Sequence, residues 1–331
     1  MAVDLTNIKY YVTAVLADGK RLSLENVAEN IAWEENENEL SMRLNLTIRD
    51  IPQTGGRLSK QLALCTIIYV HADWGEGKKE VFQGTIWEWE HSQIKDDAVY
   101  ITAYDMLYYL QKSSDSKYYA SGTSTKSIIS DILNSWVVTM GTYTAPNLAH
   151  QKTLYKSKSV SSMLTDTLIE ARRLGGGESI IRAREGKADV IAVGSNDKIY
   201  GFVADKNIVQ TRERYSITNL VTRVVIYGKE DSEGRPAIEA VLDGKTEYGV
   251  LQSIQSVGSS DISEAKQKAW DVLDEKGEPE RTISLIAPDF PAIRKGDCIH
   301  INADGINGYF HVKGIAHNAT GMVMQMEVTP R

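Results

Sequence analysis

The sequence has 331 residues and a mass of 36.8 kDa, which exceeds what one compact core usually holds and favours two or three domains. Apolar residues make up 42% and charged residues 24%, a composition typical of folded proteins rather than of disordered or fibrous ones. The net charge of -7 argues against a protein that coats nucleic acid or anionic membranes, and two cysteines, Cys65 and Cys298, exclude a four-cysteine metal site.

The amino-terminal stretch predicts no secretory leader. Asp4 and Lys9 lie where a leader would need a basic start and an uninterrupted apolar run. The longest apolar run, residues 62–70, is about half as long as a bilayer-spanning helix. We therefore expect no membrane segment.

Residues 1–105 contain short segments in which apolar and polar residues alternate, separated by glycine turns. Such alternation predicts an all-β barrel or sandwich. In the segment TIWEWE, residues 85–90, alternation places Ile86 on one face with the two glutamates and places Trp87 and Trp89 on the other. The predicted strands cover residues 10–16, 41–48, 65–71, 81–90 and 98–104.

The hydrophobic period changes to three and four residues after Asp105, which indicates helices. Ser124 or Thr125 is a suitable N-cap for the first of them, and glycines 175–177 end the second. We therefore expect a small α+β domain over residues 106–215. Its predicted elements are helices over 126–136 and 161–174 and a hairpin of strands 178–184 and 189–193.

Strand patterns resume after Ser216, and they predict a second β-rich domain over residues 216–331. One helix, at about residues 263–276, interrupts the strands and ends at Gly277. The predicted strands cover residues 219–227, 237–242, 283–286, 298–301, 309–316 and 322–328.

Charge is distributed unevenly along the chain. Residues 1–110 and residues 230–331 each carry a net charge of -7, whereas residues 111–150 carry +1 and residues 151–229 carry +6. Because the two ends are alike in charge and in strand content, we expect a duplicated barrel separated by an α+β insertion. The predicted fold class is therefore α+β, mainly β.

No motif indicates a cofactor or a metal. Glycines 175–177 follow a predicted helix and lack the Lys-Ser/Thr of a phosphate-binding loop, so a helix stop is favoured. The six histidines include no HExxH pattern; His311 and His317 are predicted to share a strand face about 20 Å apart, too far to bind one ion. The two cysteines lie in apolar segments and are expected to be core residues. We expect no cofactor, no metal and no catalytic residues.

Two further patterns leave alternatives open. Glu88 and Glu90, flanked by Trp87 and Trp89, are the candidates for a glycosidase with a sugar-stacking platform, although an outward acidic face backed by buried tryptophans is favoured. Basic residues in the middle third indicate a protein partner or intrachain ion pairs rather than nucleic acid, because aromatic residues are not interleaved with them. They are Arg172, Arg173, Arg182, Arg184, Arg212, Arg214 and Arg223.

Three passages, read in their order and spacing, carry a resemblance over nearly the whole chain. They are VYITAYDMLYYLQKS at residues 99–113, SITNLVTRVVIYGK at residues 216–229, and IRKGDCIHINADGINGYFHVKGIAHNATGMVMQMEV at residues 293–328. The sequence resembles the phage tail hub family of the XkdQ and YqbQ type, known from PBSX-like prophages. It is more distantly similar to the baseplate hub of contractile-tailed phages.

The resemblance implies a structural protein and not an enzyme. It implies two tail-tube-like barrels in one chain, so that a homotrimer would present six barrels and join a hexameric tail tube to a threefold spike or baseplate. Implied partners are the tube protein, spike and baseplate proteins and the tape-measure protein, with DNA only as cargo through an acidic lumen. His317 is then a structural residue at a strand end.

The resemblance also implies a location and a kind of particle. The protein would assemble in the bacterial cytoplasm and then reside in the tail or baseplate. The particle would be a phage, a defective prophage, a tail-like bacteriocin or another contractile injection system. A peptidoglycan- or carbohydrate-cleaving tail enzyme using the Trp/Glu strand is the alternative.

Overall fold

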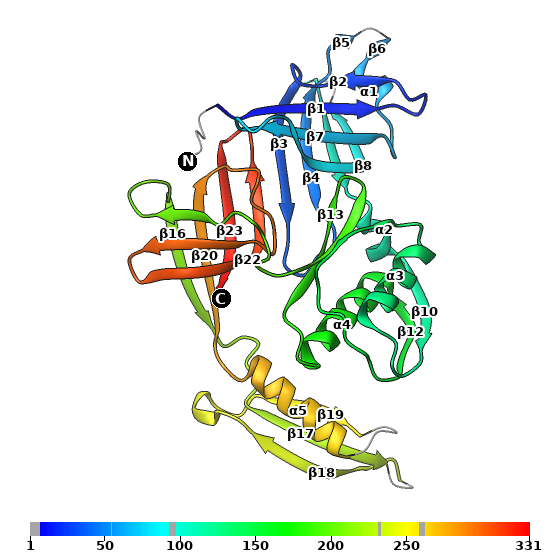
Figure 1. Ribbon diagram of the computed structural model, residues 1–331, viewed down its shortest axis with the longest axis vertical. Coiled ribbons are helices and arrows are strands. Elements are labelled where there is room, and N and C mark those ends of the chain that lie inside the picture. Colours follow the sequence, from blue (N-terminus) through cyan, green and yellow to red (C-terminus); the bar gives the residue numbers. More distant parts are fainter. Residues whose placement is uncertain (1–6, 54, 93–96, 231–232, 258–261) are drawn as a thin grey trace. The chain divides into compact units, whose positions relative to one another are not determined.

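The computed structural model describes residues 7–53, 55–92, 97–230, 233–257 and 262–331 (Figure 1). Packing divides the chain into two units. Unit 1 comprises residues 1–211 and 284–331, and unit 2 comprises residues 212–283. The three domains expected from the sequence, residues 1–105, 106–215 and 216–331, stay a prediction.

The amino-terminal strands of unit 1 alternate buried and half-buried or exposed residues, as β4 does at Arg43–Arg49. Their buried side chains, Trp33, Leu44 and Ile68 among them, form one apolar core. Strand pairing here is antiparallel throughout, as the alternation predicts. The elements are β1 (Lys9–Val15), β2 (Arg21–Ser23), β3 (Ala28–Glu35), β4, β5 (Pro52–Gln53), β6 (Gly56–Arg57), α1 (Leu58–Gln61), β7 (Ile67–Asp73), β8 (Lys79–Ser92) and β9 (Ala98–Tyr104).

The middle of unit 1 is an α+β module with its own apolar core, which includes Ile128, Leu133 and Met163. Ser124 caps α3 and Ser159 caps α4, each accepting a hydrogen bond from the amide three residues later. The predicted hairpin is confirmed as β13 and β14. The elements are α2 (Leu107–Lys112), β10 (Ser114–Tyr119), α3 (Thr125–Ser135), β11 (Met140–Tyr143), β12 (Thr153–Ser159), α4 (Val160–Arg173), β13 (Ser179–Arg184) and β14 (Lys187–Ala192).

The carboxy-terminal strands join the amino-terminal ones in one sheet, because β22 pairs with β3 (Figure 1). The order is β16-β20-β23-β22-β3-β4-β9-β8-β7-β1-β2, with β21 between β22 and β15. The prediction that the fold is mainly β is confirmed. Within the described residues the strand order does not close into a barrel, so the two tail-tube-like barrels stay a prediction. The added elements are β15 (Tyr200–Val203), β16 (Gln210–Ser216), β20 (Glu280–Pro288), β21 (Cys298–Ala303), β22 (Ile306–Asn318) and β23 (Val323–Pro330).

Unit 2 contains a three-stranded sheet with helix α5 on one face. The predicted helix at 263–276 is confirmed, because α5 spans Ile262–Lys276. Its Ala265, Ala269 and Leu273 pack against the sheet. The other elements are β17 (Arg223–Glu230), β18 (Pro236–Asp243), the short 3-10 helix η2 (Thr246–Tyr248) and β19 (Gln252–Ser256). No helix in the described residues is long and apolar enough to cross a membrane.

Two irregularities correct the predicted strand faces. The pairing of β8 with β9 shifts between Ile86 and Glu88, so that Trp87 is an inserted bulge residue. Ile86 and Trp89 therefore both contribute to the core side, and Trp87 does not share the face of Trp89. A similar shift between Val312 and Gly314 in β22 separates the faces of His311 and His317, which were predicted to coincide.

Candidate functional site

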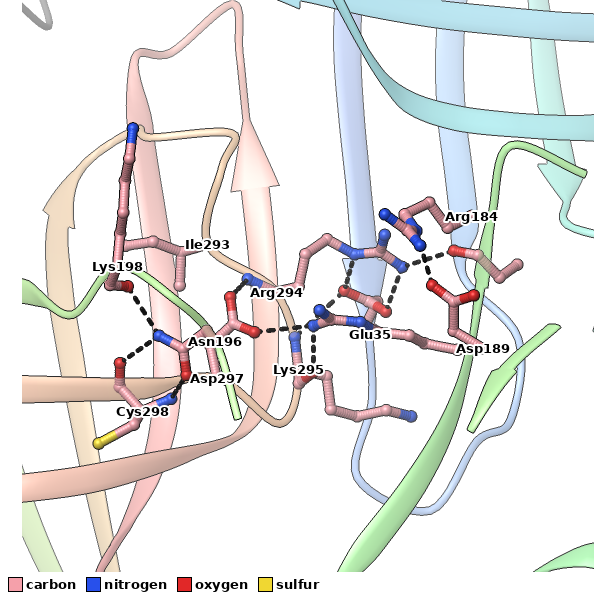
Figure 2. A network of polar contacts seen from close by, with 12 residues as sticks. Glu35, Arg184, Asp189, Asn196, Lys198, Ile293, Arg294, Lys295, Asp297 and Cys298 are labelled. Carbon is pink, nitrogen blue, oxygen red and sulfur yellow. Dashed lines mark hydrogen bonds and ion pairs between the residues drawn. The ribbon is translucent and has the colours of Figure 1, made fainter. Parts of the chain in front are cut away.

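A buried site of unit 1 that contains several charged residues lies where the segment before β21 meets strand β3 and the β13–β14 hairpin (Figure 2). Glu35 is the last residue of β3 and is 3% exposed. Residues 294–298 approach it from the far end of the chain, and Arg182 and Arg184 approach it from β13. We call this group of residues the ionic junction.

The central contact of the ionic junction is a two-pronged ion pair. Arg294 donates from Nε to Glu35 Oε2 at 2.7 Å and from Nη2 to Glu35 Oε1 at 2.8 Å (Figure 2). The same Nη2 donates to the carbonyl of Ala183 at 3.1 Å, so one guanidinium joins β3 to β13. Because a guanidinium matches a carboxylate with two parallel bonds, this pair fixes orientation as well as distance.

Lys295 forms hydrogen bonds to the loop between β3 and β4. Its Nζ donates to the carbonyls of Asn36 at 3.0 Å and Glu39 at 2.6 Å, and its backbone N–H donates to Glu35 at 3.2 Å. Burial lowers the pKa of Lys295, although the nearby Glu35 carboxylate opposes that shift. The ammonium group thus orders backbone carbonyls that no strand partner satisfies.

A second set of bonds ties the junction to the middle module. Arg182 Nη1 donates to Asp297 Oδ1 at 2.8 Å and to the carbonyl of Lys295 at 3.0 Å. Asn196 pairs with the backbone of Cys298 through its side-chain oxygen and nitrogen, at 2.6 and 2.9 Å (Figure 2). Three regions distant in sequence are therefore held at one point.

The turn at Gly296 allows this close approach. Its φ is +87°, and a Cβ there would lie 2.2 Å from Ile180 Cδ1. Only glycine combines that backbone conformation with the missing side chain. The Gly296-Asp297 turn therefore lies directly before β21.

The electrostatics of the junction favour its charged form. Burial alone would raise the pKa of Glu35, but Arg294, Lys295 and Arg182 outweigh burial and hold it at about 2. Burial would likewise lower the pKa of Arg294, and the Glu35 carboxylate reverses that effect. Both partners therefore stay ionised at neutral pH, and neither is available for proton transfer.

A cavity of about 120 Å³ lies next to the junction, between β8 and the β13–β14 hairpin. Asp105 lines it and accepts hydrogen bonds from the amides of Met42 and Leu107. Burial raises the pKa of Asp105 to about 7, and burial also raises the pKa of Glu80 on the same cavity. The Glu80 carboxylate accepts a hydrogen bond from the backbone N–H of Glu185 at 2.9 Å. This bond holds the turn of the β13–β14 hairpin against β8.

The ionic junction was not predicted from the sequence. Glu35 lies among other acidic residues, Glu34, Glu37 and Glu39, a pattern that suggests an exposed loop. Its partner Arg294 lies 259 residues away. The one local signal was the alternation of Ile31, Trp33 and Glu35, which places the carboxylate on the inward face of a strand.

The Glu88 and Glu90 candidates lie exposed on β8. The tryptophans that the glycosidase alternative would use as a sugar platform pack against the protein instead. Trp87 contacts Tyr108 and Tyr109 of α2, with ring centroids 4.7 and 4.9 Å apart, and Trp89 packs on the apolar core. The bulge at Trp87 separates the two rings, so the arrangement resembles the favoured acidic face backed by packed tryptophans more than the alternative of a two-ring sugar platform.

Among the described residues, Asp50, His91 and Asp97 are close enough together to ligate a cation. The guanidinium of Arg57 already lies there, donating to Asp97 Oδ2 at 2.8 Å and to the carbonyl of Asp50 at 2.9 Å. Asp50 also accepts two bonds from Ser59. These carboxylates are neutralised by a side chain of the protein, which disfavours a metal.

The remaining predicted residues have varied surroundings. Cys298 is buried as expected, whereas Cys65 is exposed, because it lies in a turn with φ of +65° and β7 begins only at Ile67. Arg182 and Arg184 belong to the ionic junction, where Arg184 Nε meets Asp189 Oδ2 at 2.6 Å (Figure 2). Arg223 pairs with Asp243 in unit 2, which agrees with intrachain ion pairs.

Comparisons with known proteins agree with this architecture. The chain is 24% identical over 268 residues to the phage-like element PBSX protein XkdQ of Bacillus subtilis, covering 76% of this chain and 80% of the relative. Its fold is similar to that of the 43 kDa tail protein of prophage MuSo2 from Shewanella oneidensis, with a TM-score of 0.70, 11% identity and 98% of both chains covered.

A more distant fold similarity links the chain to the E. coli c3393 protein, a component of the type VI secretion system. The TM-score is 0.54 at 10% identity, over 92% of this chain and 74% of the other. The c3393 protein is itself described as structurally similar to the bacteriophage T4 tail proteins gp27 and gp5. The profile of the YQBQ-like family matches residues 31–330, and the chain therefore belongs to the YQBQ-like family.

Proposed function

We propose that this protein is the structural hub of a phage tail or of a tail-like particle. In this proposal three copies form a ring that joins the hexameric tail tube to the threefold spike or baseplate. The match to the YQBQ-like family over residues 31–330, with the PBSX protein XkdQ among the relatives, is the observation that carries the proposal. The fold similarity to the MuSo2 tail protein supports it.

The architecture of unit 1 suits an adaptor that must transmit force without deforming. β22 pairs directly with β3, so strands from both ends of the chain belong to one sheet. The ionic junction fixes the middle module to that sheet at Glu35, Arg182 and Arg294. A ring built from such copies would hold its tube-facing and spike-facing surfaces at a constant separation.

We also propose that the role is not enzymatic. The Glu35–Arg294 and Arg182–Asp297 ion pairs of the junction are largely enclosed, and Glu88 and Glu90 lie on an exposed strand surface. Hydrolysis of a glycosidic bond needs a proton donor and a second carboxylate held on either side of the bond.

The acidic ends of the sequence suit a channel through which DNA passes as cargo without being held.

Native mass spectrometry of the chain co-expressed with the tube and spike proteins of its own particle tests the proposal. We expect complexes that contain three copies of this chain, joined to the spike trimer and to rings of six tube subunits. Complexes with one, two or six copies would contradict the adaptor role.

Purified cell walls test the enzymatic alternative on the same preparation. We expect no loss of turbidity with the natural chain or with Glu88→Gln. Turbidity loss that depends on Glu88 would contradict a purely structural role, whether or not the ring forms.

A further inference from the structure

The two-stranded sheet of β10 and β12 in unit 1 has one buried face and one exposed face. The buried face carries Tyr119 and Tyr155, which belong to the apolar core of the middle module. On the opposite face Tyr118 and Leu154 are cross-strand neighbours, and they are 61% and 51% exposed. An aromatic ring and a leucine side by side on an open sheet face form an apolar centre that is available to a partner.

Two lysines flank this apolar centre. Strand alternation places Lys152, Leu154 and Lys156 on one side of β12 and its approach, and all three are exposed. Within the part of the chain that the structure describes, neither ammonium group forms an ion pair or a hydrogen bond. The other lysines of these two strands, Lys117 and Lys158, are each paired with an aspartate. We call the exposed set the basic patch: Tyr118, Lys152, Leu154 and Lys156.

A surface of opposite charge lies on β8 and β9 of the same unit. Glu88 and Glu90 are exposed, and neither has an ion-pair partner among the described residues. Their cross-strand neighbours on β9 are Thr102 and Tyr100, which carry no charge, and Tyr100 is 39% exposed. β8 pairs with β7 only as far as Thr85, so the glutamates lie beyond that pairing. We call Glu88, Glu90 and Tyr100 the acidic patch.

The two patches are complementary in chemistry. Each combines an exposed tyrosine with two unpaired charges of one sign, and the signs are opposite. The surrounding sequence shows the same contrast, because residues 1–110 carry a net charge of -7 whereas residues 111–150 and 151–229 carry +1 and +6. Within the described residues no ion pair joins the two patches, so their charges remain available to another molecule.

We propose that the basic patch of one copy docks on the acidic patch of a neighbouring copy. The inference rests on the proposed hub function, from which it takes the ring of three copies. A contact between two different surfaces of identical chains is head-to-tail, and such contacts close into a ring when the rotation between copies allows it. The two lysines of one copy then face the two glutamates of the next, and Leu154 and Tyr118 cover Tyr100.

A second copy suits the basic patch better than nucleic acid does. Every copy carries both patches, so each copy in a closed ring has both of them covered. Two lysines provide few phosphate contacts, and the net charge of -7 on the chain repels a polyanion.

Charge reversal tests the contact in the chain co-expressed with the tube and spike proteins of its own particle. We expect Lys152→Glu with Lys156→Glu to lower the fraction of three-copy complexes in native mass spectrometry about tenfold, because like charges then oppose each other. Glu88→Lys with Glu90→Lys should have the same effect. The chain with all four changes should recover the three-copy complexes, which also shows that both patches fold with reversed charges.

Lys20→Glu with Lys60→Glu is the matched control, because it changes the net charge by the same amount. Both lysines are exposed on unit 1 outside the two patches, and neither ammonium group has an ion-pair partner among the described residues. We expect the control to leave the fraction of three-copy complexes unchanged. A loss as large as that of the patch variants would overturn the proposed contact.

The outcomes separate this inference from the hub function. Three-copy complexes that survive either patch reversal, or that the fourfold change does not recover, would overturn the docking contact and leave the hub function standing. Absence of three-copy complexes from the natural chain would overturn both. A mobility shift of DNA that Lys152→Glu with Lys156→Glu abolishes, while three-copy complexes persist, would also overturn the contact and would assign the basic patch to nucleic acid.

Discussion

In unit 1 the two ends of the chain are joined by buried charges, whereas in unit 2 helix α5 is joined to its sheet by apolar side chains. The ionic junction uses Glu35 and Arg294, both almost fully enclosed. The core under α5 uses Val224, Ile226 and Leu273. The opposite face of that sheet lies open, with Ile254 59% exposed and Val241 46% exposed.

The difference shows which kind of interaction fixes the geometry of each region. Apolar contacts tolerate small rearrangements, whereas a two-pronged ion pair is satisfied in one geometry only. A buried ion pair adds little net stability, but it makes every arrangement that separates the charges costly. In unit 1 the charges of the ionic junction fix the geometry in which the two chain ends meet, whereas in unit 2 apolar contact holds α5 on its sheet.

The largest expected effect comes from breaking the junction. Glu35→Gln leaves the Arg294 guanidinium buried without its carboxylate, and we expect a loss of about 3–5 kcal/mol in the free energy of unfolding. Glu29→Gln on the same strand is the matched control, because its ion pair with Arg49 is exposed. Urea denaturation should show that the control loses less than about 1 kcal/mol in the free energy of unfolding. Equal effects of the two changes would contradict the role of burial.

The two faces of the unit 2 sheet give the next largest difference. Ile226→Ala removes a side chain packed beneath α5 and should destabilise unit 2 by about 2–4 kcal/mol. Ile254→Ala on the open face should change stability by only about 0.5 kcal/mol. Amide exchange of α5 distinguishes the two variants. Similar losses of protection would mean that the open face is part of a core.

Two buried carboxyl groups of unit 1 are expected to make the stability of the fold depend on pH in opposite directions. Glu35, with a pKa of about 2, contributes stability above its unfolded value of 4.5, and this is lost as pH falls towards 2. Asp105, with a pKa of about 7, has the opposite sign: stability declines as pH rises from its unfolded value of 3.8 through 7.

In Asp105→Asn the free energy of unfolding should decline less steeply with rising pH than in the natural chain, by about 1 kcal/mol per pH unit. Because asparagine keeps only one of the two acceptor oxygens, the slope of stability against pH between 4 and 7 is the readout, rather than its absolute value. Urea denaturation of the natural chain and the variant across that range measures it. Parallel slopes would show that Asp105 is ionised in the folded protein.

The smallest effect concerns the two thiols. Cys65 is exposed and Cys298 is buried, with burial raising the pKa of the Cys298 thiol. A thiol reagent should therefore modify one cysteine per folded chain quickly and the second only after unfolding, with almost no change in stability. Rapid modification of both in the folded protein would contradict the packing of β21.

Local signals predicted much of the fold. The caps at Ser124 and Ser159, the period of α5 and the turn between β13 and β14 each depend on residues close in sequence. The helix predicted over residues 161–174 begins within one residue of α4, although its cap, Ser159, was not predicted. The alternation of β4 and β9 similarly depends only on the strand itself.

The remainder depended on contacts that local patterns do not encode. β3 was missed because Glu35 occupies an inward position and is stabilised there by Arg294, a partner from the other end of the chain. The faces of Trp87 and His317 were misassigned because one inserted residue reverses strand alternation, and nothing in the alternation itself marks the bulge.

Cryo-electron microscopy of the chain bound to tube and spike tests the central claim most directly. The account predicts a ring of three copies in which residues 1–105 and residues 216–331 alternate around the axis and contact successive tube subunits. A ring of six copies, or three copies that contact the tube through only one of these two regions, would contradict it.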